Sequence, residues 1–137
     1  MTPSILPPAT IGILGGGQLG RMTALAARAM GYRVQVLDPD PDCAARPVVD
    51  RVVAASFDDA DGAAELARAC DVITLEIEQI APAALESARR HAPVRPDPEI
   101  IRLIQHRGRQ KRWLADNGFP VGAFRLVTSA DSLAAAA

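Results

Sequence analysis

The sequence has few cysteines, few aromatic residues and almost no net charge. Its two cysteines are too few for a disulfide framework and show no metal-ligand spacing, which favours a reducing, cytoplasmic compartment. The 15 basic and 16 acidic side chains leave a net charge of −1, so no overall field attracts nucleic acid or an anionic membrane. A single tryptophan in a nearly neutral chain weakens a nucleic-acid role further.

Long hydrophobic runs are also missing. Residues 2–20 carry no charge, but prolines and glycines interrupt them, and no apolar run approaches the roughly 20 residues that a membrane-spanning helix needs. The stretch also lacks the basic start and the continuous apolar centre of a signal peptide. What is present, 49% hydrophobic and 23% charged residues, is typical of a globular protein without a membrane partner.

Short apolar strands alternate with amphipathic helices along the chain. The pattern predicts strands over 10–14, 33–37, 51–55 and 71–75, and a short fifth strand over 93–95 is compatible with it. Helices are predicted over 18–30, from 58 or 59 to 70, over 82–91, from 97 onward, and in a further segment that ends at 117. Such alternation predicts an α/β fold of the Rossmann-like, doubly wound type, with a parallel sheet covered on both faces.

Two helical patterns lead to expectations about packing. In helix 18–30, Met22, Leu25, Ala26 and Ala29 follow the spacing of a single apolar face. In the next helix Cys70 ends a similar apolar series, so we interpret it as a small core residue and not as a reactive thiol.

The chain divides into three predicted parts. Residues 1–9 form a loose, proline-rich lead-in, residues 10–118 form the α/β domain, and residues 119–137 begin a second domain. Within the last part a strand is predicted over 121–127 and a helix over 130–137. An isolated helix of that length is marginal in water, so the simplest interpretation is a chain that stops just inside a second domain.

Residues 15–20 read Gly-Gly-Gly-Gln-Leu-Gly and satisfy the pattern G-x-G-x-x-G directly between a strand and a helix. Glycines allow a tight turn and a close approach to a ligand, and the helix N-terminus offers free N–H groups to an anion. A glycine turn used only for strand–helix packing is the alternative interpretation.

Acidic residues follow two of the predicted strands. Asp38 lies where a dinucleotide enzyme bonds the ribose 2′-hydroxyl, which makes an NAD-dependent dehydrogenase a serious hypothesis. Two features oppose it, because residues 39–42 form a stiff acidic loop and the fourth strand ends in Glu76-Ile77-Glu78. Strand periodicity puts both glutamates on one side, where a carboxylate facing the glycine turn suits a ligand with a phosphate and hydroxyls. Two solvated acids are the alternative, and the pair is insufficient for a metal site.

A basic run lies between Glu99 and Asp116. It contains Arg102, Arg107, Arg109, Lys111 and Arg112. We rank a solvated helix face first, a nucleotide phosphate site second and nucleic-acid binding third.

Four motifs together resemble a known family. They are Gly15 to Met22, Leu37 to Pro39, Thr74 to Glu78, and Gln105 to Arg107 followed by Lys111. In order and spacing they are similar to 5-(carboxyamino)imidazole ribonucleotide synthase of the ATP-grasp superfamily. The resemblance runs from about Thr10 to the last residue. A glycinamide ribonucleotide formyl-transferring relative shares the Glu-Ile-Glu end but typically has Glu at the position of Gln18, so the carboxylase fits better.

The resemblance implies a reaction, its ligands and their sites. Bicarbonate, activated by ATP and Mg²⁺ as carboxyphosphate, would carboxylate the exocyclic amine of aminoimidazole ribonucleotide. The substrate is expected at Gly17, Gln18, Leu19 and Glu76, and ATP at Arg107 and Lys111. The catalytic and metal-binding residues of the family would follow Ala137, so this pre-ATP-grasp portion would be inactive alone. We expect the full-length enzyme to be a homodimer.

One position departs from the family. His106 stands where the family usually has Asp, which could cap the helix that starts at Arg107 or hold that arginine. Its loss predicts a missing cap, worth about 0.5–2 kcal/mol. Besides the ATP-grasp carboxylase, two other hypotheses stay open: a nicotinamide-dependent dehydrogenase and a non-catalytic nucleotide-sensing module.

Overall fold

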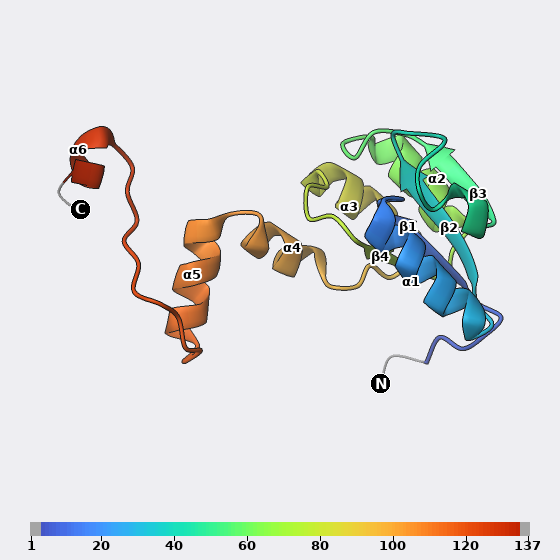
Figure 1. The fold of residues 1–137 in the computed structure, drawn as a ribbon, viewed down its shortest axis with the longest axis horizontal. Helices are drawn as coiled ribbons and strands as arrows, with labels where there is room; N and C mark the ends of the chain where they lie inside the picture. Colours follow the sequence, from blue (N-terminus) through green and yellow to red (C-terminus); the bar gives the residue numbers. More distant parts are fainter. Residues whose placement is uncertain (1–3, 135–137) are drawn as a thin grey trace. The chain divides into compact units, whose positions relative to one another are not determined.

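The structure, a computed structural model, describes residues 4–134 and has two compact units, one running to Ile101 and the other beginning at Arg102. In the first unit strands and helices alternate (Figure 1). Its elements are β1 (Thr10–Leu14), α1 (Gln18–Ala29), β2 (Arg33–Asp38), the 3₁₀ helix η1 (Arg46–Val48), β3 (Arg51–Ala54), α2 (Ala60–Arg68), β4 (Val72–Leu75) and α3 (Pro82–Arg89). Helix α4 (Pro98–Ile104) contains the boundary, and α5 (Arg107–Asp116) and α6 (Ala130–Ala134) follow.

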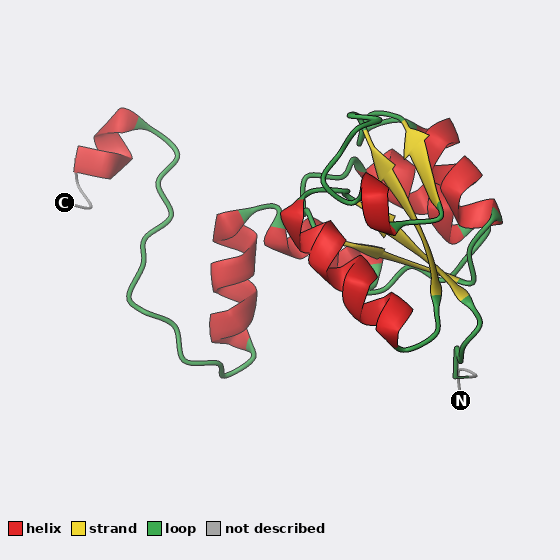
Figure 2. Ribbon diagram, turned by 45° about the vertical axis from the view of Figure 1, so that its right-hand side comes forward, coloured by secondary structure: helices red, strands yellow, loops and turns green. Residues whose placement is uncertain are grey.

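The four strands form one parallel sheet in the order β3-β2-β1-β4. Helix α1 lies on one face, and α2 and α3 lie on the other and pack against each other (Figure 2). The predicted fifth strand is reduced to one parallel bridge, in which Val94 pairs with Ile73. The prediction of a parallel α/β sheet covered on both faces is confirmed.

Alternation along the strands decides which helix each side chain meets. Ile13, Val34 and Val36 point to one face and form a core cluster with Ala24 and Ala27 of α1. Such alternation is the direct result of the two-residue period of a strand.

The opposite face of β1 depends on a glycine. A Cβ atom at Gly12 would lie 2.5 Å from Ile73 Cδ1 and 2.9 Å from Cys70 Sγ, so the absent side chain makes room on β1 for Ile73 of β4 and for Cys70, which follows α2. Burial, and then the charge of Asp71, raise the pKa of the Cys70 thiol to about 12. These contacts support a packing role for Cys70 and an unreactive thiol.

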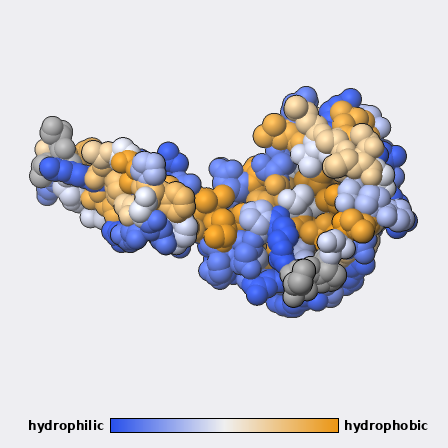
Figure 3. Space-filling model, turned by 90° about the horizontal axis from the view of Figure 1, so that it is seen from below, coloured by the Kyte–Doolittle hydropathy of each residue, from blue (hydrophilic) through white to orange (hydrophobic). Residues whose placement is uncertain are grey.

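The apolar series noted in the sequence of α1 is not the face that packs on the sheet. Met22 and Leu25 are 56% and 47% exposed, whereas the buried residues of α1 are Gly20, Ala24 and Ala27. Close packing selects the small residues, because a Cβ atom on Gly20 would lie only 2.3 Å from the carbonyl oxygen of Gly15. Apolar side chains accordingly reach the surface in patches among polar ones (Figure 3).

The lead-in that we expected to be loose is held by hydrogen bonds over its described residues. Tyr32 Oη donates to the Ile5 carbonyl at 2.9 Å, and Arg33 N donates to the Ala9 carbonyl at 3.0 Å. Residues 1–3 lie outside the described range. No helix within residues 4–134 is both long and apolar enough to cross a lipid bilayer.

The second unit is built differently, since none of its described residues, 102–134, is buried. Trp113 and Phe119 stack with ring centroids 5.9 Å apart. The strand predicted over 121–127 is wrong, because a strand needs a hydrogen-bonded neighbour and the described residues supply none there. Helix α6 covers Ala130–Ala134, and the last three residues of the predicted helix lie outside the described range. A domain boundary after residue 118 stays a prediction.

Candidate functional site

The turn between β1 and α1 is a loop of three glycines whose backbone conformation depends on them. Gly15 has φ of +109°, a region that side chains rarely adopt, and its N–H donates to the Leu37 carbonyl at 2.9 Å. The first helical hydrogen bond runs from Arg21 N to the Gly17 carbonyl at 2.9 Å. The loop therefore turns the chain sharply from the sheet into α1.

The beginning of α1 presents backbone N–H groups near this loop. Gly17 is the N-cap and has no side chain that could accept a hydrogen bond, and the first turn has no acidic residue. Gln18 and Leu19 are exposed, and the first N–H groups of a helix have no acceptor within the helix. This end of α1 can therefore accept an anionic group.

Glu76 faces the glycine loop from the neighbouring strand. Leu14 pairs with Leu75, and Glu76 N donates to the Leu14 carbonyl at 3.1 Å, so the residue after β4 comes level with Gly15. Glu76 Oε1 lies 2.9 Å from the place that a Cβ atom on Gly15 would take, and 3.0 Å from the corresponding place on Gly17. The half-buried carboxylate forms no hydrogen bond or ion pair with any described residue. The structure thus brings Gly17, Gln18, Leu19 and Glu76 together at one edge of the sheet.

Glu78 differs from Glu76 in its backbone position and its burial. Strand β4 ends at Leu75, before either glutamate, and Ile80 N donates to the Glu78 carbonyl at 2.9 Å in a turn. Strand periodicity therefore does not apply to the pair, and Glu78 is exposed where Glu76 is half-buried.

Asp38 has a role that sequence reasoning missed. Its Oδ2 accepts from Gly16 N at 2.8 Å and its Oδ1 accepts from Asp40 N at 2.9 Å. A dinucleotide site would use this carboxylate for a ribose hydroxyl and the loop N–H groups for the pyrophosphate. Here the Asp38 carboxylate holds the loop itself, and the N–H groups of Gly15 and Gly16 already donate to Leu37 and Asp38. This arrangement favours a structural role for Asp38 over a ribose-binding one. The signal for this role was the expected parallel pairing of the first two strands. That pairing puts Asp38, the last residue of β2, beside the glycine loop that follows β1.

The two residues expected to bind ATP lie in the second unit and share a cavity. Its volume is about 320 Å³, and Arg107, Lys111 and residues 124–127 contribute to its lining. Lys111 Nζ lies 5.7 Å from the ring centroid of Phe124, and Arg107 donates to Gln110 Oε1 at 2.8 Å.

The predicted loss of a cap at residue 106 is wrong. His106 is the N-cap of α5, and its Nδ1 accepts from Arg109 N at 3.2 Å. An imidazole with an unprotonated Nδ1 provides the acceptor that an aspartate would have provided.

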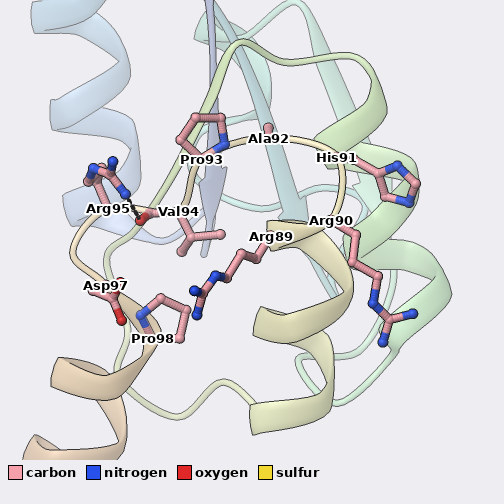
Figure 4. Close-up of a pocket in the computed structure, with 9 residues that line it drawn as sticks. All are labelled: Arg89, Arg90, His91, Ala92, Pro93, Val94, Arg95, Asp97 and Pro98. Carbon is pink, nitrogen blue, oxygen red and sulfur yellow. Dashed lines mark hydrogen bonds between the residues drawn. The ribbon is translucent and has the colours of Figure 1, made fainter. Parts of the chain in front are cut away.

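A larger cavity of about 480 Å³ lies between the end of α3, residues 91–95 and the start of α4. Arg89 points into it toward Asp97 and Pro98, whereas Arg90 and His91 point away (Figure 4). None of the glycine-loop residues lines this cavity. Within residues 4–134 no group of three or more His, Cys, Asp or Glu side chains could hold a metal ion.

A glycine loop and a helix N-terminus after β1, with an acidic residue after the adjacent β4, lie at the switch point of a parallel sheet, the arrangement typical of nucleotide-binding α/β domains. Residues 8–105 match the model of the ribonucleotide synthetase preATP-grasp domain. The chain therefore belongs to the ribonucleotide synthetase preATP-grasp family.

Individual relatives agree with this assignment. The chain is 41% identical over 133 residues to an N5-carboxyaminoimidazole ribonucleotide synthase of Brucella melitensis, covering 97% of this chain and 37% of that protein. An ADP complex of an N5-carboxyaminoimidazole ribonucleotide synthetase superposes with a TM-score of 0.92 at 41% identity, covering 99% and 36% of the two chains. The Aspergillus clavatus synthase in complex with ADP and 5-aminoimidazole ribonucleotide has a TM-score of 0.70 at 34% identity, covering 84% and 31%. This chain thus spans about a third of the length of these relatives, between 31% and 37%.

Proposed function

We propose that this chain is the ribonucleotide-binding portion of an ATP-dependent carboxylase that converts 5-aminoimidazole ribonucleotide and bicarbonate into the 5-carboxyamino product of purine biosynthesis. The names of the relatives support the reaction, and the Aspergillus clavatus complex supports the two small-molecule ligands of that enzyme. The observation that carries the proposal here is the Glu76 carboxylate, which stands without a described partner against the glycine loop.

The geometry suggests how the ligand would be held. A phosphate would lie at the start of α1, where the N–H groups of Gln18 and Leu19 and the helix dipole favour negative charge. Glu76, on the other side of the loop, would accept hydrogen bonds from ribose hydroxyls. With both ends of the sugar phosphate held, the exocyclic amine of the base would be kept in one orientation for carboxylation.

In the second unit we assign ATP contacts to Arg107 and Lys111, which line one cavity. A guanidinium and an ammonium group are suited to phosphate oxygens. Magnesium bound with ATP would neutralise charge on its phosphates. Its ligands are expected beyond residue 137, so no step is assigned to it in this chain, which we expect to be inactive alone.

We further propose that the full-length enzyme is a cytoplasmic homodimer. The exposed apolar face of α1 supports self-association, because Met22 and Leu25 are 56% and 47% exposed. Sedimentation of the full-length enzyme tests this, with Met22→Glu as the variant expected to weaken the dimer.

Substitution of Glu76 tests the ligand assignment. In the full-length enzyme Glu76→Gln removes a charge-assisted acceptor worth about 1.5–3 kcal/mol, so affinity for aminoimidazole ribonucleotide should fall roughly ten- to a hundredfold. ATP affinity and melting temperature should stay nearly unchanged, because the residue lies after the strand and outside the core. Calorimetry and thermal unfolding measure these quantities.

Glu78→Gln is the matched control and should have a smaller effect. A lower melting temperature with unchanged substrate affinity would make Glu76 a structural residue.

A further inference from the structure

The glycine loop is held on its inner side by the segment that follows β2. Gly16 N donates to Asp38 Oδ2 at 2.8 Å, and the Gly16 carbonyl accepts from Ala45 N at 2.8 Å. Both polar groups of Gly16 are therefore bonded to residues 38–45. Arg21 of α1 also donates to the Ala44 carbonyl at 3.0 Å, which ties the beginning of the helix to the same segment.

Asp38 connects the two segments with a single carboxylate. While Oδ2 holds Gly16, Oδ1 accepts from Asp40 N at 2.9 Å and fixes the start of the 38–45 segment. The packing between them is tight, since a Cβ atom on Gly16 would lie 2.5 Å from Cys43 Sγ and 3.3 Å from Asp38 Cβ. Gly16 is buried and Asp38 is half-buried, so water competes only in part for these bonds.

We propose that Asp38 is a positioning residue of the ribonucleotide site, which fixes the glycine loop and withdraws the Gly16 N–H from ligand binding. With Gly16 engaged, the N–H groups left for an anion are those at the start of α1 beside Gln18 and Leu19. That arrangement suits the single phosphate of a mononucleotide at the start of α1. The identity of the ligand rests on the proposed function, but the hydrogen bonds that hold the loop do not.

Asp59 offers a matched control for Asp38. Its Oδ1 also accepts from two backbone N–H groups, those of Asp61 and Gly62, both at 2.9 Å, but it does so at the start of α2. In the full-length enzyme Asp38→Ala and Asp59→Ala each remove an aspartate that accepts two backbone hydrogen bonds. We expect similar losses of melting temperature from both.

The two variants should differ in ligand affinity. Calorimetry with aminoimidazole ribonucleotide should give an affinity about tenfold or more lower for Asp38→Ala, because a loop displaced by about 1 Å misplaces the binding groups. Asp59→Ala should bind like the wild type. Asp38→Asn keeps one acceptor oxygen and should recover part of the affinity. Equal affinities for Asp38→Ala and Asp59→Ala would overturn the proposal.

Hydrogen exchange separates this inference from the proposed function. The Gly16 amide should exchange faster in Asp38→Ala than in the wild type or in Asp59→Ala, with no ligand present. Unchanged exchange at Gly16 would overturn the positioning role. If the wild-type enzyme failed to bind aminoimidazole ribonucleotide, the proposed function would fall, and the exchange result alone would decide whether Asp38 holds the loop.

Discussion

Helices α1 and α2 lie on opposite faces of one sheet, but their N-termini are satisfied in different ways. Asp59 caps α2 by accepting from the N–H groups of Asp61 and Gly62, and Asp61 adds an acidic side chain to the first turn. Helix α1 begins at the N-cap Gly17 and has no acidic residue in its first turn. The N-terminal N–H groups of α2 are therefore bonded within the fold, whereas no side chain caps those of α1, where we propose the phosphate site.

The faces of the two helices differ as well. Helix α2 buries five of its nine residues, including Leu66, whereas α1 buries three small residues of twelve. Leu25 of α1 is 47% exposed and Leu66 of α2 is fully buried. The comparison indicates that α2 contributes more side-chain burial to the stability of the first unit, while α1 has an uncapped N-terminus and an exposed apolar surface.

The largest effect on stability is expected from substitution of Leu66, with the same substitution at Leu25 as its comparison. Leu66→Ala creates a cavity in the core and should lower the free energy of unfolding by about 2–5 kcal/mol. Leu25→Ala should change it by about 0.5 kcal/mol or less, since the side chain already contacts water. Urea denaturation followed by circular dichroism measures both values. Equal losses would show that α1 packs through Leu25 and would remove the contrast between the helices.

A smaller effect is expected from the cap of α2. Asp59→Ala removes the acceptor for two N–H groups and should cost about 0.5–2 kcal/mol in the free energy of unfolding. Asp59→Asn keeps a neutral acceptor and should recover most of the loss. The same urea titrations provide the measurement. No loss in Asp59→Ala would mean that water satisfies this helix end as well as the carboxylate does.

The smallest effect concerns the C-terminal end of α1 and depends on pH. A hydrogen bond from Arg28, and then the Val34 N–H, hold the pKa of Asp50 below its ordinary value of 3.8. A lowered folded pKa means that this stabilisation is present above 3.8 and is lost as the pH falls through the folded value. Urea midpoints at a series of acidic pH values should therefore decline less steeply in Asp50→Asn than in the wild type. If the urea midpoints of the two proteins fell in parallel with pH, groups other than Asp50 would cause the loss of stability in acid.

Much of the fold follows from local patterns that the sequence contains. The strands and helices of the first unit lie within a few residues of their predicted bounds, because apolar runs, caps and breakers act over short distances. The glycine turn and the acidic end of β4 could also be placed beforehand, since the carboxyl ends of adjacent parallel strands meet at one edge. These features by themselves determined the sheet and the location of the candidate site.

Other features depended on atomic geometry or on contacts between distant segments. The sequence left open a ribose-binding role for Asp38 in a dehydrogenase, whereas the structure bonds Asp38 to Gly16 and Asp40. The choice between two apolar faces of α1 depended on how closely Gly20 approaches Gly15. The cap formed by His106 required its ring geometry, and the strand expected over 121–127 lacks a neighbouring strand. Tertiary structure decided the role of Asp38, because its hydrogen bond to Gly16 joins residues 22 positions apart and exists only when both are in place. The His106 cap and the Gly15–Gly20 contact are local, but they depend on atomic geometry that residue types alone do not give.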